Sequence, residues 1–246
     1  MFLLYSIVNI IVVFYLREKN MNGLTHKDIV KASSEKLKEW VASGYNLDVV
    51  SSAGKNALFK IECPERIDIL LSAGVQANRL DIGGKNPLYS HENKEIIEML
   101  LRAGADPNCE AKGTGSTPLF SCQSIEKIDT LIKGGADINH LNNLGRNCLF
   151  YYDFPDFVSK LIRYGAEVNV FDNVGKNVLF FSHNDNKIKL LIDNDADPRA
   201  IDKTGLCVFD LLNSDLKSYV IEKERSVLRE IFNDVPIIKN KKDLSY

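Results

Sequence analysis

The most constraining feature of this chain is a short motif that returns every 30 or 31 residues. The motif reads Gly-x-x-x-Leu-aromatic, and it first appears as Gly54-Lys55-Asn56-Ala57-Leu58-Phe59. Its glycines stand at positions 54, 84, 115, 145, 175 and 205, and the pattern fades in the last copy. A fixed period in this range predicts stacked supersecondary units and excludes a single globular core.

A second marker follows twenty residues after the motif glycines and predicts where a helix ends. It is glycine at positions 44, 74, 104, 135 and 165, and Asp195 takes its place in the next unit. Apolar residues stand seven, four and three positions before each marker, as Ile97, Leu100 and Leu101 do before Gly104. This spacing is typical of an amphipathic helix, and glycine favours the left-handed conformation that ends one. Each unit therefore predicts a tight turn, a short helix, a longer helix and a loop, in an all-α fold.

Several segments resemble the ankyrin repeat. Gly104-Ala105-Asp106-Pro107-Asn108 and Thr117-Pro118-Leu119-Phe120 carry the resemblance most clearly, and it extends over roughly residues 24–232. The resemblance implies an ankyrin-repeat solenoid of stacked helix-turn-helix units with tight turns at the tips. It also implies a non-enzymatic module that binds a partner protein through the concave face and the turn tips. The style of the repeats is similar to that of stand-alone bacterial ankyrin proteins, which implies an antitoxin-like or a host-directed role.

The repeat is shorter than an ankyrin unit of about 33 residues. The missing residues fall between the motif glycine and the second marker, so we expect the first helix to lack nearly one turn. An aromatic residue also stands where the family has a histidine. We expect this ring to fill core volume left by the shortened helix, and an exposed aromatic binding strip is the alternative. The five aromatic residues are Phe59, Tyr89, Phe120, Phe150 and Phe180.

We expect the repeat domain to span residues 21–232. It would contain an N-terminal capping unit at 24–53, repeats that start near 54, 84, 115, 145 and 175, and a C-terminal cap at 205–232. Residues 233–246 are polar, contain Pro236, and are expected to form a mobile tail.

The beginning of the chain admits three interpretations. Residues 2–16 form an apolar run of fifteen residues, fewer than the roughly 20 that span a bilayer. The run could be a short membrane anchor that leaves the repeats on the cytoplasmic side, or an extra helix docked on the array. Alternatively, translation could start at Met21, and residues 1–20 would then be an artefact of gene calling.

Charge and composition argue against several function classes. The net charge is −2, and no basic block precedes Lys239, Lys241 and Lys242, so nucleic-acid binding is not expected. Five cysteines without a CxxC pair predict reduced, mostly buried thiols in a cytoplasmic protein. The four histidines are scattered and no catalytic motif is present, so we expect no metal, no cofactor and no catalytic residue. We expect a monomer.

Residues that the fold does not dictate are the candidates for partner binding. The residue after the turn glycine is basic in four of six units, which favours an acidic partner, although solubility alone would also explain it. Tyr151 and Phe181 stand at a register that is polar in sister repeats, as interface anchors do, with extra packing as the alternative. A membrane-tethered cytoplasmic scaffold anchored by residues 2–16 is the alternative function. The predicted partner-binding residues are Lys55, Lys85, Leu144, Arg146, Tyr151, Val174, Lys176 and Phe181.

Overall fold

The computed structural model describes residues 23–233. Helices and turns make up this part of the chain, which contains no strand beyond one isolated bridge between Ile201 and Cys207. The chain separates between Tyr151 and Tyr152 into two compact units, which we call the first and the second unit.

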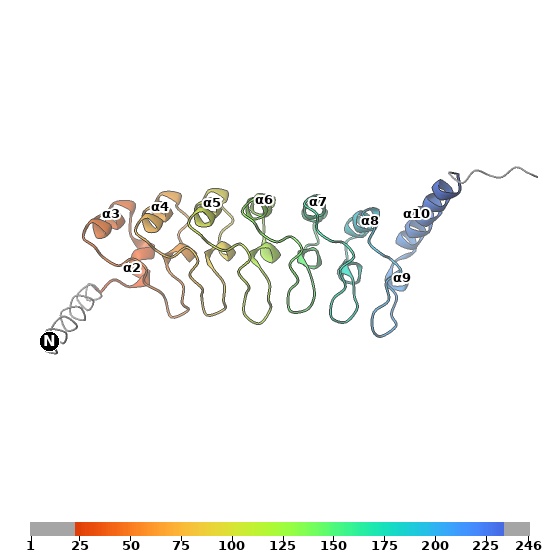
Figure 1. The fold of residues 1–246 in the computed structure, drawn as a ribbon, viewed down its shortest axis with the longest axis horizontal. Coiled ribbons are helices and arrows are strands. Elements are labelled where there is room, and N and C mark those ends of the chain that lie inside the picture. The colour runs from red at the N-terminus through yellow and green to blue at the C-terminus, as the bar shows by residue number, and fades with distance from the viewer. Residues whose placement is uncertain (1–22, 234–246) are drawn as a thin grey trace, which may run out of the picture. The chain divides into compact units, whose positions relative to one another are not determined.

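In the first unit, α3, α4, α5 and α6 lie side by side along one edge, and hairpin loops form the opposite edge (Figure 1). Short 3₁₀ helices lie between these two edges and contact one another in sequence order. The elements are α2 (His26–Lys31), α3 (Ser34–Ala42), η1 (Ala57–Phe59), α4 (Pro64–Ser72), η2 (Pro87–Tyr89), α5 (Lys94–Arg102), η3 (Pro118–Ser121), α6 (Ile125–Lys133) and η4 (Cys148–Tyr151).

The second unit repeats this arrangement and then departs from it. Helix α7 packs on α8, α8 packs on α10, and η5 packs on α9. Helix α10 has 20 residues, whereas α7 and α8 have nine each, so α10 continues for more than two turns beyond the length of the earlier helices. The elements are α7 (Pro155–Arg163), η5 (Val178–Phe181), α8 (Asp185–Asp193), α9 (Val208–Leu211) and α10 (Ser214–Asn233).

The longer helices end where the sequence predicts, and polar side chains cap the beginnings of several of them. Asn93 and Ser124 cap α5 and α6 by accepting a hydrogen bond from a backbone N–H of the first turn. Each second-marker glycine has a positive φ, for example 84° at Gly74. Asp195 takes the same conformation with a φ of 66°, so the helix end is kept where the glycine is missing.

The first helix of each repeat is a 3₁₀ turn of three or four residues, which confirms the predicted shortening. The aromatic residue of this 3₁₀ turn is buried in some repeats and only half-buried in others. Phe59, Phe120 and Phe150 are buried, whereas Tyr89 and Phe180 are half-buried. The Tyr89 hydroxyl donates to the carbonyls of Cys109 and Ser116, which anchors the ring at the edge of the core.

A column of buried polar side chains, which the sequence analysis did not recognise, holds each repeat together. It consists of the residue two positions after the turn glycine, and each member has no exposed surface. Asn86 Nδ2 donates to the carbonyl of Asp106 at 2.7 Å and to Asn78 Oδ1 at 3.0 Å, and Asn86 Oδ1 accepts from the N–H of Leu88 at 3.2 Å. One side chain therefore ties the short helix to the loops before and after its repeat. The column contains Asn56, Asn86, Thr117, Asn147 and Asn177.

Thr117 differs from the rest of the column, because its hydroxyl, the only polar group of its side chain, has no hydrogen-bond partner, whereas Asn56 lacks a partner only at Oδ1 and is bonded through Nδ2. Asn56 and Asn177 make the same bond as Asn86, to the carbonyl twenty residues later, at 2.9 and 2.8 Å. A buried polar group without a partner costs free energy, whereas a paired one contributes to stability.

Two substitutions test the column. Asn86→Ala should lower the free energy of unfolding by about 1–3 kcal/mol, because it leaves buried backbone groups unpaired. Thr117→Val, of similar shape, should have no effect or a small stabilising one, because it removes a hydroxyl that has no partner. Urea unfolding followed by circular dichroism measures both, and equal losses in the two variants would contradict this role of the column.

Candidate protein-binding surface

Four of the six hairpin loops are built around an Asp or Asn side chain that bonds its own backbone, whereas the same register holds Ser51 in the first hairpin and Ala111 in the third. Asp81 Oδ1 accepts from the N–H groups of Gly83 at 2.9 Å and Lys85 at 3.0 Å. Asp172 and Asp202 form the same two bonds in their loops, and Asn142 forms them with its amide oxygen. These Asp and Asn residues are therefore turn formers.

Neighbouring hairpins are joined by backbone hydrogen bonds within each unit. In the first unit, the N–H groups of Ile82, Lys112 and Asn143 donate to carbonyls of the preceding hairpin at 3.0, 2.7 and 2.9 Å. In the second unit, the N–H of Lys203 donates to the carbonyl of Val174 at 3.0 Å. Side chains at the tips are thus presented from a fixed backbone.

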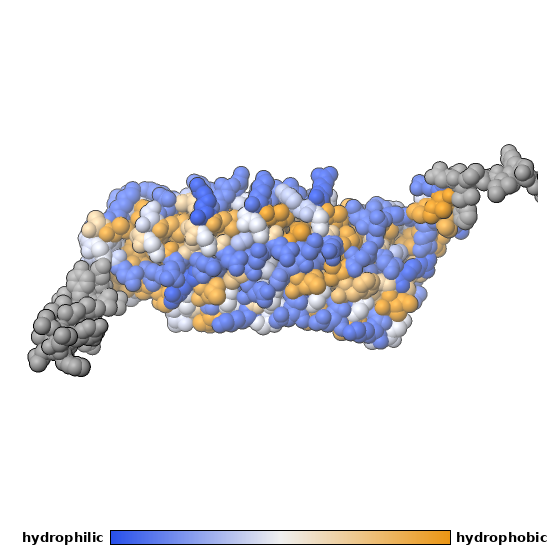
Figure 2. All heavy atoms as spheres, in the orientation of Figure 1, coloured by the Kyte–Doolittle hydropathy of each residue, from blue (hydrophilic) through white to orange (hydrophobic). Residues whose placement is uncertain are grey.

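The tips carry large apolar side chains that are exposed to solvent. Four of them are 48–71% exposed in the first unit, and four are 37–61% exposed in the second. Figure 2 shows apolar surface between hydrophilic patches along the hairpin edge of each unit. We call this set the apolar tip residues: Leu80, Ile82, Leu141 and Leu144 in the first unit, and Phe171, Val174, Ile201 and Leu206 in the second.

Only Leu144 and Val174 of this set were selected from the sequence. Four other members could have been found from the sequence, because apolar residues recur at one register of the repeat. They are Leu80, Leu141, Phe171 and Ile201. The sequence alone does not tell whether that register is buried, and the structure shows that it faces solvent. In the third hairpin the same register holds Glu110, which is also exposed.

The four predicted basic residues share a contact that the sequence analysis missed. Each places its charged group over the aromatic ring four positions later, at 5.3–5.8 Å from the ring centre. Lys55 Nζ also lies 3.6 Å from Asp81 Oδ2, and Lys176 Nζ lies 3.6 Å from Asp202 Oδ2. The basic residues therefore stabilise the shortened repeat, whatever they contribute to binding. The pairs are Lys55–Phe59, Lys85–Tyr89, Arg146–Phe150 and Lys176–Phe180.

The two predicted aromatic anchors differ in exposure. Tyr151 is 44% exposed; its hydroxyl accepts from Asn142 Nδ2 at 2.5 Å, and its ring packs edge-on against Phe120. Phe181 is half-buried. Tyr151 thus combines a fixed position with exposed ring surface, which suits an interface residue.

Comparison with solved structures agrees with this geometry. The chain is similar to the crystal structure of the ankyrin repeat domain of Bcl-3, with a TM-score of 0.66 and 20% identity, over 78% of this chain and 96% of that one. It is also similar to the human ASB11 ankyrin repeat domain, with a TM-score of 0.65 and 21% identity, over 77% and 91% of the two chains. The chain has the ankyrin-repeat fold. No protein-family model and no curated protein matches the sequence.

The predicted all-α ankyrin solenoid is confirmed as a fold, and its buried charges belong to that fold. Lys127 Nζ pairs with Glu92 Oε1 at 3.0 Å in the first unit, and Lys187 Nζ pairs with Asp153 Oδ1 at 3.1 Å in the second. Neither lysine side chain is exposed, and burial lowers the pKa of Lys187 while Asp153 opposes that shift. Each pair links a helix to the loop that precedes the helix of the previous repeat, and the lysine is not accessible to a ligand.

The cysteines and other metal-binding side chains form no candidate site within residues 23–233. All five cysteines are free, and Cys109, Cys122 and Cys148 are buried. Burial raises the pKa of Cys148 to about 12, so this thiol is not a reactive thiolate at neutral pH. Among residues 23–233, no group of three or more His, Cys, Asp or Glu residues is placed to hold a metal ion.

The predicted membrane anchor at residues 2–16 lies outside the described residues, as does the predicted tail after Asn233. Within the described part of the chain, no helix is long and apolar enough to cross a membrane.

The Asp202 carboxylate predicts a pH dependence of folding stability. The Thr204 hydroxyl lowers the pKa of Asp202 most, and the N–H groups of Leu206 and Thr204 and the charge of Lys176 lower it further, against an opposing effect of burial. A carboxylate whose pKa is lowered by folding stabilises the fold above its unfolded pKa, and this stabilisation is lost as the pH falls through its folded pKa.

Asp202→Asn should therefore lower stability at neutral pH and reduce the further loss below about pH 4. Asn142 forms the same turn in another hairpin, so the substitution keeps the backbone bonds. Urea unfolding at neutral pH and at about pH 3 measures the difference. If both proteins lose the same stability on acidification, Asp202 makes no contribution of this kind.

Proposed function

We propose that this chain is a non-enzymatic protein-binding module that captures a partner protein through its hairpin tips and the adjoining short helices. The observation that carries the proposal is the set of exposed apolar tip residues. Exposed apolar side chains on an ordered backbone are typical of protein interaction sites.

The fold itself does not require these apolar residues. Each turn ends with a glycine in the left-handed conformation, and four of the six start with an Asp or Asn side chain that bonds the turn backbone; the apolar tip residues supply neither. Glu110 stands at the register of Leu80 and Leu141, so the same backbone accepts a charge there. The apolar residues therefore serve something other than folding.

The partner surface should combine apolar and acidic groups. Lys85 is exposed beside the tips of the first unit, and it forms no ion pair within the described residues. Tyr151 adds exposed aromatic surface in the same unit. A positive charge near an apolar contact steers an acidic partner and limits binding of basic ones.

The resemblance to bacterial ankyrin proteins implies either neutralisation of a toxin-like partner or binding of a host protein, and the captured protein distinguishes them. We further propose a cytoplasmic monomer, in keeping with free thiols. A membrane-tethered scaffold is the second candidate, because residues 2–16 are apolar.

Affinity capture from native lysate, with the full chain and with residues 21–246, tests the proposal. We expect one stoichiometric protein in both captures, identified by mass spectrometry. Membrane recovery with the full chain alone would favour the scaffold, and the absence of any specific protein in both captures would contradict the binding module.

Changing two apolar tip residues tests the surface. Leu141→Asp with Leu144→Asp should weaken capture by at least about tenfold, because about 1.4 kcal/mol of interface energy corresponds to a factor of ten in Kd. Val41→Asp is the matched control, since Val41 is an exposed apolar residue on α3, away from the tips. All variants should keep the helical circular dichroism signal. Equal affinity of the tip variant and the control would place the interface elsewhere.

A further inference from the structure

One row of exposed side chains runs across the hairpin tips of the first unit. The N–H groups of Ile82, Lys112 and Asn143 each donate to the preceding hairpin, at 3.0, 2.7 and 2.9 Å, so these residues have equivalent places in successive hairpins. The residues two positions earlier are therefore equivalent as well. We call them the tip row: Leu80 in the second hairpin, Glu110 in the third and Leu141 in the fourth.

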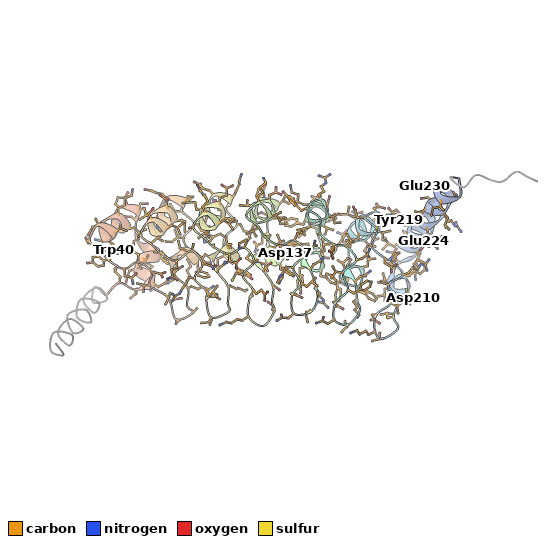
Figure 3. The ribbon with its side chains drawn as sticks, in the orientation of Figure 1. Trp40, Asp137, Asp210, Tyr219, Glu224 and Glu230 are labelled. Atoms are coloured by element: carbon orange, nitrogen blue, oxygen red, sulfur yellow. The ribbon has the colours of Figure 1, made fainter. Side chains whose placement is uncertain are left out.

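The tip row is apolar at both ends and acidic in the middle. Leu80 and Leu141 are 48% and 50% exposed, and the side chain of Glu110 is 59% exposed. Figure 3 shows side chains projecting from the hairpin loops at the edge opposite the longer helices, with Asp137 in the loop between α6 and the fourth hairpin. All three side chains of the tip row are thus open to a partner.

The carboxylate of Glu110 has no hydrogen-bond partner among residues 23–233. It approaches His140, whose Nε2 lies 3.9 Å from Glu110 Oε1. That nitrogen also lies 2.7 Å from the carbonyl oxygen of Gly115, a distance at which it donates to the carbonyl. A solvent-exposed carboxylate between two apolar side chains favours a partner that places a positive charge over it.

The spacing of the hairpins decides which backbone of a partner meets all three side chains. Helices α4, α5 and α6 pack side by side, and packed helices lie about 10 Å apart, which sets the hairpin spacing. Two turns of an α-helix, about seven residues, rise about 10.8 Å and return to the same face. A strand covers about 10 Å in about three residues, and its side chain then points to the opposite face. One face of a helix therefore reaches all three hairpins, whereas one face of a strand reaches only the outer two.

Two lysines lie beside the tip row and set the charge expected on the flanks of such a helix. Lys85 and Lys112 are exposed, and neither forms an ion pair within the described residues. Acidic residues on the flanks would pair with these lysines, in agreement with the acidic groups expected on the partner.

We propose that the tip row receives an α-helix of the partner protein, with apolar residues about fourteen positions apart and a Lys or Arg midway. The two apolar residues contact Leu80 and Leu141, and the basic residue pairs with Glu110. This inference rests on the proposed function, because it names the structure that the tips of the first unit recognise.

A phage-displayed library tests the proposal. Its probe is a stable three-helix scaffold protein with random residues along one exposed helix face, selected against the full chain, against Glu110→Lys and against Leu141→Asp with Leu144→Asp. The unaltered chain should enrich apolar residues about fourteen positions apart with Lys or Arg midway. Glu110→Lys should enrich Asp or Glu at the midway position, because the facing charge is reversed. The double variant should not enrich the apolar pair.

One selected scaffold protein gives the magnitude of the effect. Its Kd, measured by fluorescence anisotropy, should rise by at least about tenfold for Glu110→Lys, because like charges then face each other. Glu95→Lys is the matched control, since Glu95 is exposed in the first turn of α5 and forms no ion pair among residues 23–233. This control should leave the Kd unchanged.

Several outcomes would overturn the proposal. They are a selection that enriches no helix, an enriched helix without the midway charge preference, and binders that come only from a Pro-containing library of the same length, which would indicate an extended segment. A dimer of the unaltered chain that Leu141→Asp with Leu144→Asp dissociates, in sedimentation equilibrium, would overturn it in favour of a second copy.

The same double variant separates this inference from the proposed function. If it loses capture of the partner protein from lysate but no helix with the midway charge is selected, the helix is wrong and the tip surface stands. If it keeps full capture, the tip surface and the helix are both wrong.

Discussion

The fold depends most on a buried amide that reaches across its own repeat. Asn86 holds the short helix between two loops, and Asn56 and Asn177 make the corresponding bond to the loop that follows. A repeat of 30 residues has little helix of its own at this place, since a three- or four-residue 3₁₀ turn is marginal without packing. The side-chain amide holds the short helix by hydrogen bonds, whereas a longer first helix would be held by the packing of its additional turn. The hairpins, and with them the surface side chains, are positioned by this support.

A second repeated contact compensates for the same shortening. The aromatic residue fills the volume beside the 3₁₀ turn, and the basic residue four positions earlier covers its outer face. The Lys55–Asp81 and Lys176–Asp202 pairs extend this contact to the next hairpin within each unit. The basic residue therefore has a structural reason to recur, and recurrence alone is not evidence of a binding site.

The sequence predicted what depends on local periodicity. The helix ends, the short first helix and the all-α repeat fold all follow from spacing, and the structure has them. The sequence did not reveal that Asn86 spans two loops or that Lys55 lies on Phe59, because these contacts join groups whose proximity only the folded repeat sets. Exposure at Leu80 and Leu141 was missed for the same reason, since an apolar register can face the core or the solvent.

The central claim is that the hairpin tips bind a protein. Amide hydrogen exchange of the chain, before and after addition of the protein recovered by affinity capture, tests it most directly. The account predicts new protection at the tips, within residues 80–85, 141–146, 171–176 and 201–206, and unchanged exchange along the outer faces of α4, α5, α6, α7 and α8. Protection concentrated on those helices, with unchanged tips, would contradict it.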